Sequence, residues 1–135
     1  MEIEDFPLAW RWNQAEHNVL PIEVLAALIP LDLEAARIFS EGVPAAPAGN
    51  WLKFDASNKQ LDARKWFVSL KVPDQRVIIS WSENMALSLP WVVFCKYWDD
   101  FCYPTSDDVD IFLENKHHFL RWSHFELFEH NPSAL

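Results

Sequence analysis

The chain has 135 residues, of which 50% are hydrophobic, and its formal net charge is −9. This length predicts a single domain over residues 1–135, and eight Trp with ten Phe exclude a disordered chain, because buried aromatic rings supply a real core. The acidic balance argues against nucleic acid and anionic membranes as partners and favours basic ones. Alternatively, the acidity only keeps an aromatic-rich protein in solution.

No apolar run approaches the ~18 residues that a membrane-spanning helix needs. Residues 1–5 are acidic and lack the hydrophobic segment of a secretory signal. We therefore expect a cytoplasmic protein that makes no membrane contact. Only two Gly are present, which excludes a glycine-rich phosphate-binding loop.

The N-terminal third predicts one strand and a pair of helices. Residues 6–12 are aromatic and predict a short strand, with Trp10 and Trp12 on the same side. Residues 21–28 predict a helix with Pro in its first turn, and residues 33–40 predict a second helix. The two helices form a hairpin or corner.

The remainder predicts a sheet, because short apolar segments alternate with turn residues. A further helix is expected within residues 58–69. Six segments have the composition or alternation of strands, namely residues 51–54, 76–81, 85–89, 109–113, 118–122 and 124–128. Residues 42–49 are rich in Pro and Ala and predict a surface loop.

The densest aromatic run, residues 89–104, predicts a central helix from about residue 90 to 102. One helical face carries its large apolar side chains and both cysteines, namely Trp91, Phe94, Cys95, Trp98 and Cys102. Buried, reduced thiols are favoured over a disulfide or a metal site. The fold class predicted is α+β, a single domain in which this helix packs on an antiparallel sheet beside the N-terminal helical pair.

An acidic cluster follows this helix. Five carboxylates crowd into twelve residues, namely Asp99, Asp100, Asp107, Asp108 and Asp110. They predict a docking surface for a basic protein, with Tyr103 as an aromatic anchor. A divalent metal is an alternative, but the spacing of a calcium-binding loop is absent. The third interpretation is a solvated loop with one Asp capping a turn.

Histidines near the C-terminus offer a different chemistry. His117, His118 and His124 lie close to Glu126 in the sequence, a combination that can bind zinc or act as general acid and base. No zinc-binding helix motif is present, so structural or surface histidines are favoured. No nucleophile motif accompanies them, so neither catalytic residues nor a cofactor is predicted.

Several short phrases resemble a family of small uncharacterised proteobacterial proteins. The phrases are Ala9–Trp12, Leu20–Ala26, Ile29–Leu31, Trp91–Phe94 and Trp98–Phe101. The resemblance covers both ends of the chain, skips residues 41–75 and implies no catalytic residue. In size, acidity and aromatic content the chain is also similar to polymorphic-toxin immunity proteins, an analogy of type that sets only an expectation.

These observations lead to three functional hypotheses. The first is a non-enzymatic protein-binding module of the immunity or inhibitor type that docks its acidic surface onto a basic partner. The second is a small metal-dependent enzyme or ligand-binding domain that uses His124, Glu126 and the acidic loop. The third is a structural subunit whose tryptophans bury a homodimer interface.

Overall fold

The computed structural model describes residues 1–134, which form five α-helices, two short 3-10 helices and one seven-stranded sheet. The helices are η1 (Ile3–Asp5), α1 (Trp10–Asn13), α2 (Ile22–Ala27), α3 (Leu33–Gly42), α4 (Ala63–Ser69), α5 (Trp91–Phe101) and η2 (Pro132–Ala134). The strands are β1 (Ile29–Pro30), β2 (Leu52–Asp55), β3 (Arg76–Ser82), β4 (Met85–Pro90), β5 (Val109–Leu113), β6 (His118–Ser123) and β7 (Leu127–His130). The predicted α+β class is confirmed.

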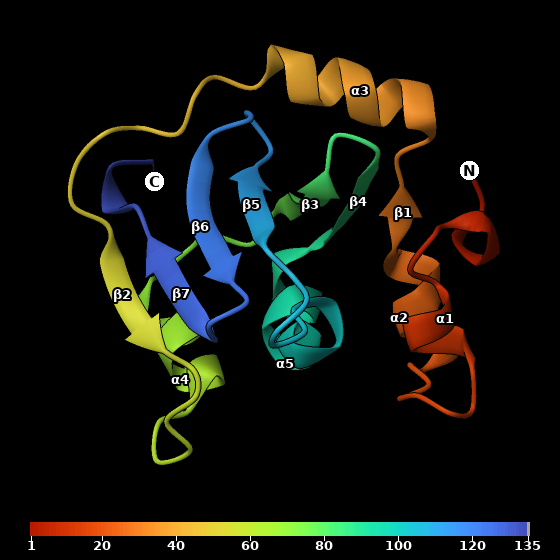
Figure 1. Ribbon diagram of the computed structural model, residues 1–135, viewed down its shortest axis with the longest axis horizontal. Helices are drawn as coiled ribbons and strands as arrows, with labels where there is room; N and C mark the ends of the chain where they lie inside the picture. Colours follow the sequence, from red (N-terminus) through yellow and green to blue (C-terminus); the bar gives the residue numbers. More distant parts are fainter. Residues whose placement is uncertain (135) are drawn as a thin grey trace.

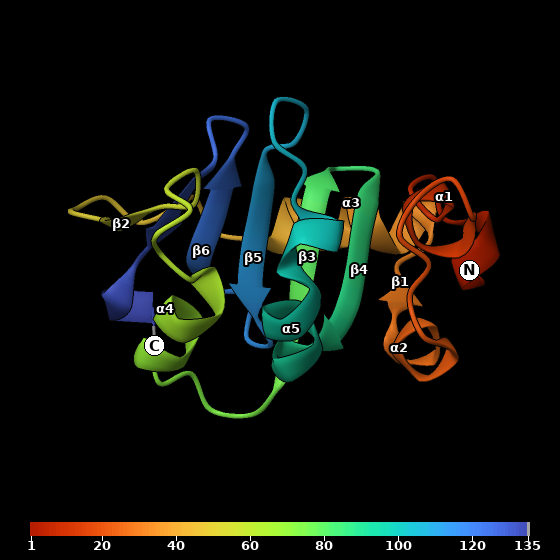
Figure 2. The same cartoon turned by 90° about the horizontal axis from the view of Figure 1, so that it is seen from below.

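The sheet has the order β1-β4-β3-β5-β6-β7-β2, and every neighbouring pair is antiparallel. Helices α4 and α5 cover one face, and α3 lies across the opposite face (Figure 1). The view from below shows α5 in front of the central strands and α3 behind them (Figure 2). The two edge strands, β1 and β2, are joined by α3 and a linker over residues 43–51, which together cross the sheet (Figure 1).

The core lies between the sheet and the pair α4 and α5, and it consists largely of aromatic rings. Phe67 of α4 lies 5.6 Å from Phe94 of α5 and 5.2 Å from Phe128 of β7, measured between ring centroids. All three side chains are at most 1% exposed. Burying such a ring contributes about 1.5–3 kcal/mol each, so this layer holds α4 and α5 on the sheet.

Helix α3 begins where the sequence predicts. Asp32 caps its N-terminus, where the carboxylate accepts a hydrogen bond of 2.8 Å from the Ala35 N–H. The buried face of α3 places Phe39 against Phe112 of β5, with ring centroids 5.2 Å apart. α3 therefore covers the half of the sheet from β1 to β5 (Figure 1).

Near the N-terminus one prediction was wrong and the predicted pair of helices is present. Residues 6–12 do not form a strand, because Phe6 ends η1 and Trp10 begins α1. Trp10 and Trp12 therefore lie on different sides of a short helix, 37% and 0% exposed, since a two-residue step turns a helix by more than half a circle. The two predicted helices exist as α2 and α3, but β1 lies between them and pairs with β4.

Two element boundaries also differ. The helix expected within residues 58–69 begins only at Ala63, because side chains of Asp55 and Asn58 bond nearby backbone N–H groups and stabilise turns. The strand expected at 124–128 begins at Leu127, and Glu126 has a φ of 62° in the turn before it. The side chains at 124 and 126 therefore do not alternate on a strand.

The central helix is as predicted, and of its two thiols one is buried. Pro90 precedes α5 as its N-cap, and the helix runs to Phe101 with a kink at Tyr97. Cys95 is half-buried and Cys102 is buried, and both are free thiols. Among the described residues, no helix has the length and apolar composition needed to cross a bilayer.

Candidate functional site

The structure separates the six predicted partner-binding residues into different environments. Asp107 is 6% exposed and forms two hydrogen bonds with the Arg11 guanidinium, at 2.6 and 2.9 Å. The Tyr103 N–H donates a third bond to Asp107, at 2.9 Å. Burial acts to raise the pKa of Asp107, but these bonds outweigh it and hold the pKa below its ordinary value. Asp107 thus fixes the loop between α5 and β5 to α1.

The two acids of α5 differ in exposure. Asp100 is only 8% exposed and accepts a hydrogen bond of 2.9 Å from Asn18. Burial raises the pKa of Asp100, and neighbouring Asp99 adds to the effect. Asp99 is exposed, with a carboxylate oxygen 3.9 Å from Arg64 of α4. A contact of that length between exposed groups contributes little to stability.

Tyr103 and Asp108 lie in one surface region with residues from two other segments. We name this region the loop surface and define it by Trp10, Tyr103, Asp108, His124 and Phe125. The Trp10 and Tyr103 rings lie 6.5 Å apart, and the Arg11 guanidinium stacks over Tyr103 at 3.9 Å. On the other side, the Thr105 N–H donates to the His124 carbonyl at 3.0 Å, which ties the α5–β5 loop to the β6–β7 turn.

Asp108 connects the two loops electrostatically. One of its oxygens accepts a 3.0 Å bond from the His124 N–H and lies 2.9 Å from Nδ1 of the His124 ring. The hydrogen bond with the His124 ring holds the pKa of Asp108 below its ordinary value. Asp108 is therefore ionised at neutral pH and remains exposed to solvent.

Sequence reasoning missed Phe125. It sits at the β6–β7 turn, its side chain is 77% exposed, and its ring contacts the ring of His124 at 4.1 Å between centroids. The alternation over residues 124–128 placed Phe125 on the face of Leu127. Phe125 points outward because it lies in the turn. The turn requires a positive φ at Glu126. A Gly at this position would have predicted such a turn, but Glu does not.

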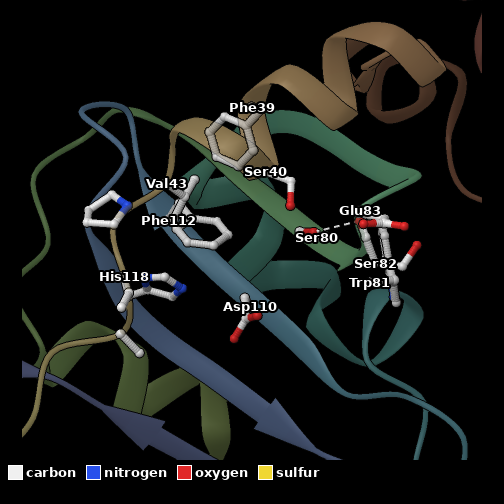
Figure 3. Close-up of a pocket in the computed structure, with 13 residues that line it drawn as sticks. Phe39, Ser40, Val43, Ser80, Trp81, Ser82, Glu83, Asp110, Phe112 and His118 are labelled. Carbon is white, nitrogen blue, oxygen red and sulfur yellow. Dashed lines mark hydrogen bonds between the residues drawn. The ribbon is translucent and has the colours of Figure 1, made fainter.

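Asp110 lies apart from the loop surface, on the sheet face beneath α3. It lines a pocket of about 350 Å³ between α3, the following linker and strands β3 and β5. Figure 3 shows His118 and Asp110 facing this hollow, with Phe39 and Phe112 along its α3 side and Glu83 at the opposite end. Ser40, Ser80 and Ser82 add hydroxyl groups to its lining.

A β-bulge aims His118 into this pocket. The β5–β6 register passes from Ile111 opposite Leu120 to Phe112 opposite His118, which skips Phe119. Without the extra residue, His118 would share a face with Leu120 and the core. Instead its ring lies 4.1 Å from Phe112, whereas Phe119 packs on Trp91 of α5 at 5.3 Å.

The electrostatics of the pocket are unbalanced. Asp110 keeps contact with solvent at the mouth, yet the surrounding protein removes enough water to raise its pKa, an effect that His118 and Arg121 only partly oppose. Desolvation lowers the pKa of His118, so its imidazole is neutral at pH 7. His118 is 9% exposed, and its buried Nδ1 has no hydrogen-bond partner among the described residues. A neutral imidazole and a poorly compensated carboxylate thus line one hollow.

The histidines do not assemble into a metal centre. His117 is exposed before β6, His118 lies beneath α3, and His124 belongs to the loop surface. Within residues 1–134, no group of three or more His, Cys, Asp or Glu side chains is arranged to hold a metal ion. The donor set of the alternative hypothesis, around His124 and Glu126, is therefore not brought together in the described part of the chain.

No family model matches this chain, and neither the curated proteins nor the solved structures include a significant match to it.

Proposed function

We propose that this protein is a cytosolic, non-enzymatic protein-binding module of the immunity or inhibitor type, and that it docks the loop surface onto a basic protein. The observation that carries the proposal is Phe125, an aromatic side chain 77% exposed at the tip of a turn. Aromatic anchors of this kind dominate the binding energy of protein interfaces. The core does not need this ring, whose contact is with the neighbouring His124.

The rigidity of the surroundings supports the same proposal. Tyr103 is held through its N–H by Asp107 and through its carbonyl by the Trp122 indole, at 2.9 and 3.2 Å. The turn that carries Phe125 is held by the two contacts between Asp108 and His124. An interface made of fixed groups loses less conformational entropy on binding than one made of mobile loops.

Charge supports a basic partner. Residues 80–135 carry nine acidic and three basic side chains, a balance of −6 within the total of −9. Asp108 and Glu126 flank Phe125 on neighbouring loops. Such a field accelerates association with a positively charged surface and makes the rate depend on salt.

The test is site-specific photo-crosslinking in cells that naturally produce the protein. A benzophenone amino acid replaces Phe125, and the control replaces Val68 of α4, which is also 77% exposed. We expect position 125 to capture one basic protein that position 68 does not. The same set of captured proteins at both positions would overturn the proposal.

The captured protein then permits a test of charge. Reversal of Asp107 would unfold the loop, because Asp107 is buried in its ion pair with Arg11. Asp108→Asn removes one exposed charge and retains an oxygen that accepts from the His124 N–H. We expect slower, less salt-dependent association than for the matched control Asp74→Asn, whose exposed carboxylate lies near α4.

A further inference from the structure

We propose that the pocket beneath α3 is a binding site for a free small organic cation, an ammonium or guanidinium group on a short carbon chain. The carboxylate of Asp110 holds the charge, and the aromatic wall of the pocket contacts the chain. This site lies on the α3 face of the sheet and is separate from the loop surface.

The charge of the lining selects a cation. Asp110 and Glu83 line the pocket, and none of the described residues that line it is Lys or Arg. Arg121 is the cross-strand neighbour of Asp110, but its guanidinium is engaged by Glu129 at 3.2 Å and stacks over Trp51 at 4.0 Å. The positive charges near Asp110 therefore compensate its carboxylate only partly, and a bound cation supplies the missing positive charge.

Shape and wall chemistry select an organic ligand. A volume of about 350 Å³ lies in the range of small-molecule sites, about 300–1,000 Å³. Phe112 presents an aromatic ring, which attracts an ammonium or guanidinium group, whereas the Phe39 ring already has the Lys116 ammonium 5.8 Å from its centroid. A metal ion fits less well, because the described residues offer no cluster of three donors.

The bulge at Phe119 is the independent sign that the pocket is built. It turns His118 out of the core and toward Asp110, leaving a ring 9% exposed with an unpartnered Nδ1. An orphaned buried nitrogen costs stability, and bulges of this kind are over-represented beside functional sites. A ligand in the hollow meets the accessible edge of this ring, while Nδ1 itself is closed off from solvent.

The first experiment is an NMR titration of the full chain with n-butylammonium and methylguanidinium. We expect the amide signals of Ser80, Glu83 and Asp110 to shift in a saturable way. n-Butanol has the same chain without the charge and is expected to leave these signals unchanged, as are calcium and zinc ions. Equal shifts with butanol, tighter binding of either metal, or no shift at the pocket would each overturn the proposal.

Matched variants distinguish binding at the pocket from attraction by the overall negative charge of the protein. Asp110→Asn is expected to weaken n-butylammonium binding about tenfold, the loss typical of one charge-assisted contact. Asp74→Asn removes the same charge on the opposite side of the sheet and is expected to leave the affinity unchanged. Equal weakening by Asp74→Asn would overturn the proposal. Retained NMR dispersion of each variant shows that it has folded.

A pH series and a peptide complete the test. Asp110 faces His118, Arg121 and Asp108, and affinity is expected to fall as acid protonates Asp110 and His118. Asp110→Asn is expected to show a weaker dependence. An acetyl-Gly-Lys-Gly-amide peptide carries the same ammonium on a backbone. Tighter binding of this peptide than of n-butylammonium would show that the pocket binds a lysine of a partner protein. That result would overturn the proposal of a free small cation.

Discussion

At the scale of single residues, Asp107 and Asp110 lie close in sequence, yet their surroundings shift the pKa values of their carboxyl groups in opposite directions. Asp107 is buried, but Arg11 and the Tyr103 N–H satisfy it and lower its pKa. Asp110 is exposed, but the surrounding protein removes part of its hydration and His118 and Arg121 compensate this only partly, so its pKa is raised. The fold therefore stabilises the charge of Asp107 and disfavours that of Asp110, the second effect being the smaller because solvent screens an exposed carboxylate.

The first prediction concerns the ion pair. Asp107→Ala is expected to lower the free energy of unfolding by about 3–5 kcal/mol, because it leaves the Arg11 charge buried without a partner. Urea denaturation at pH 7 measures this change. The exposed neighbour serves as the control, and Asp108→Ala is expected to cost less than about 1 kcal/mol. Equal losses for both variants would contradict a special role for the buried pair.

The second prediction concerns pH. The pKa of Asp110 is raised in the folded state, so its ionised form opposes folding above that pKa, and the penalty disappears once acid protonates both states. Asp110→Asn is therefore expected to stabilise the protein at pH 7 and to lose that advantage as the pH falls from the raised pKa of the folded state through the ordinary value of 3.8. Urea denaturation across this range measures it. Destabilisation by Asp110→Asn at pH 7 would show that Arg121 compensates the charge fully.

At the scale of elements, α3 decides whether the pocket exists. Its capping residue, Asp32, fixes where the helix begins, and Phe39 on its buried face packs on Phe112. The neighbouring edge strand β1 has two residues, too few to position α3 by backbone pairing alone. The cap and the aromatic contact together hold α3 over β3 and β5.

The third prediction tests this cap. Asp32→Ala is expected to lower the free energy of unfolding by about 0.5–2 kcal/mol, because the Ala35 N–H loses its acceptor. Asp32→Asn retains an oxygen acceptor and is expected to cost much less. Hydrogen exchange at the first turn of α3 locates the effect. Faster exchange spread evenly over the whole sheet would contradict a local role.

At the scale of the whole molecule, the core sequesters the two free thiols. Cys102 is 1% exposed, and burial raises its pKa well above the ordinary 9.0. Cys95 is half-buried, and burial raises its pKa to about 12. Both groups remain protonated at neutral pH, and the thiolate is the reactive form.

The fourth prediction follows from this burial. An aromatic disulfide reagent at pH 8 is expected to label neither thiol quickly in the native protein and both thiols in urea. Cys102 is expected to react at the rate of global unfolding, and Cys95→Ser isolates its kinetics. Rapid labelling of Cys102 in the folded protein would mean that the core opens locally around α5.

Periodicity alone determined much of this molecule. The strands near residues 76–81, 85–89 and 109–113 and the central helix could be predicted, because each has a local pattern of apolar side chains that its own segment satisfies. The acidic surface charge and the reduced cysteines also follow from composition. These properties depend on which residues are present, so they need no knowledge of the fold.

Only the tertiary structure decided the candidate sites. Arg11 meets Asp107 across 96 positions in the chain, and the bulge at Phe119 turns His118 from the core to the pocket. Phe125 is exposed because a turn, and not a strand, contains it. Each depends on pairing or register between distant segments, and a shift of one residue reverses the face on which a strand side chain lies. Local patterns cannot encode such a shift, because it is set by the packing of the whole chain.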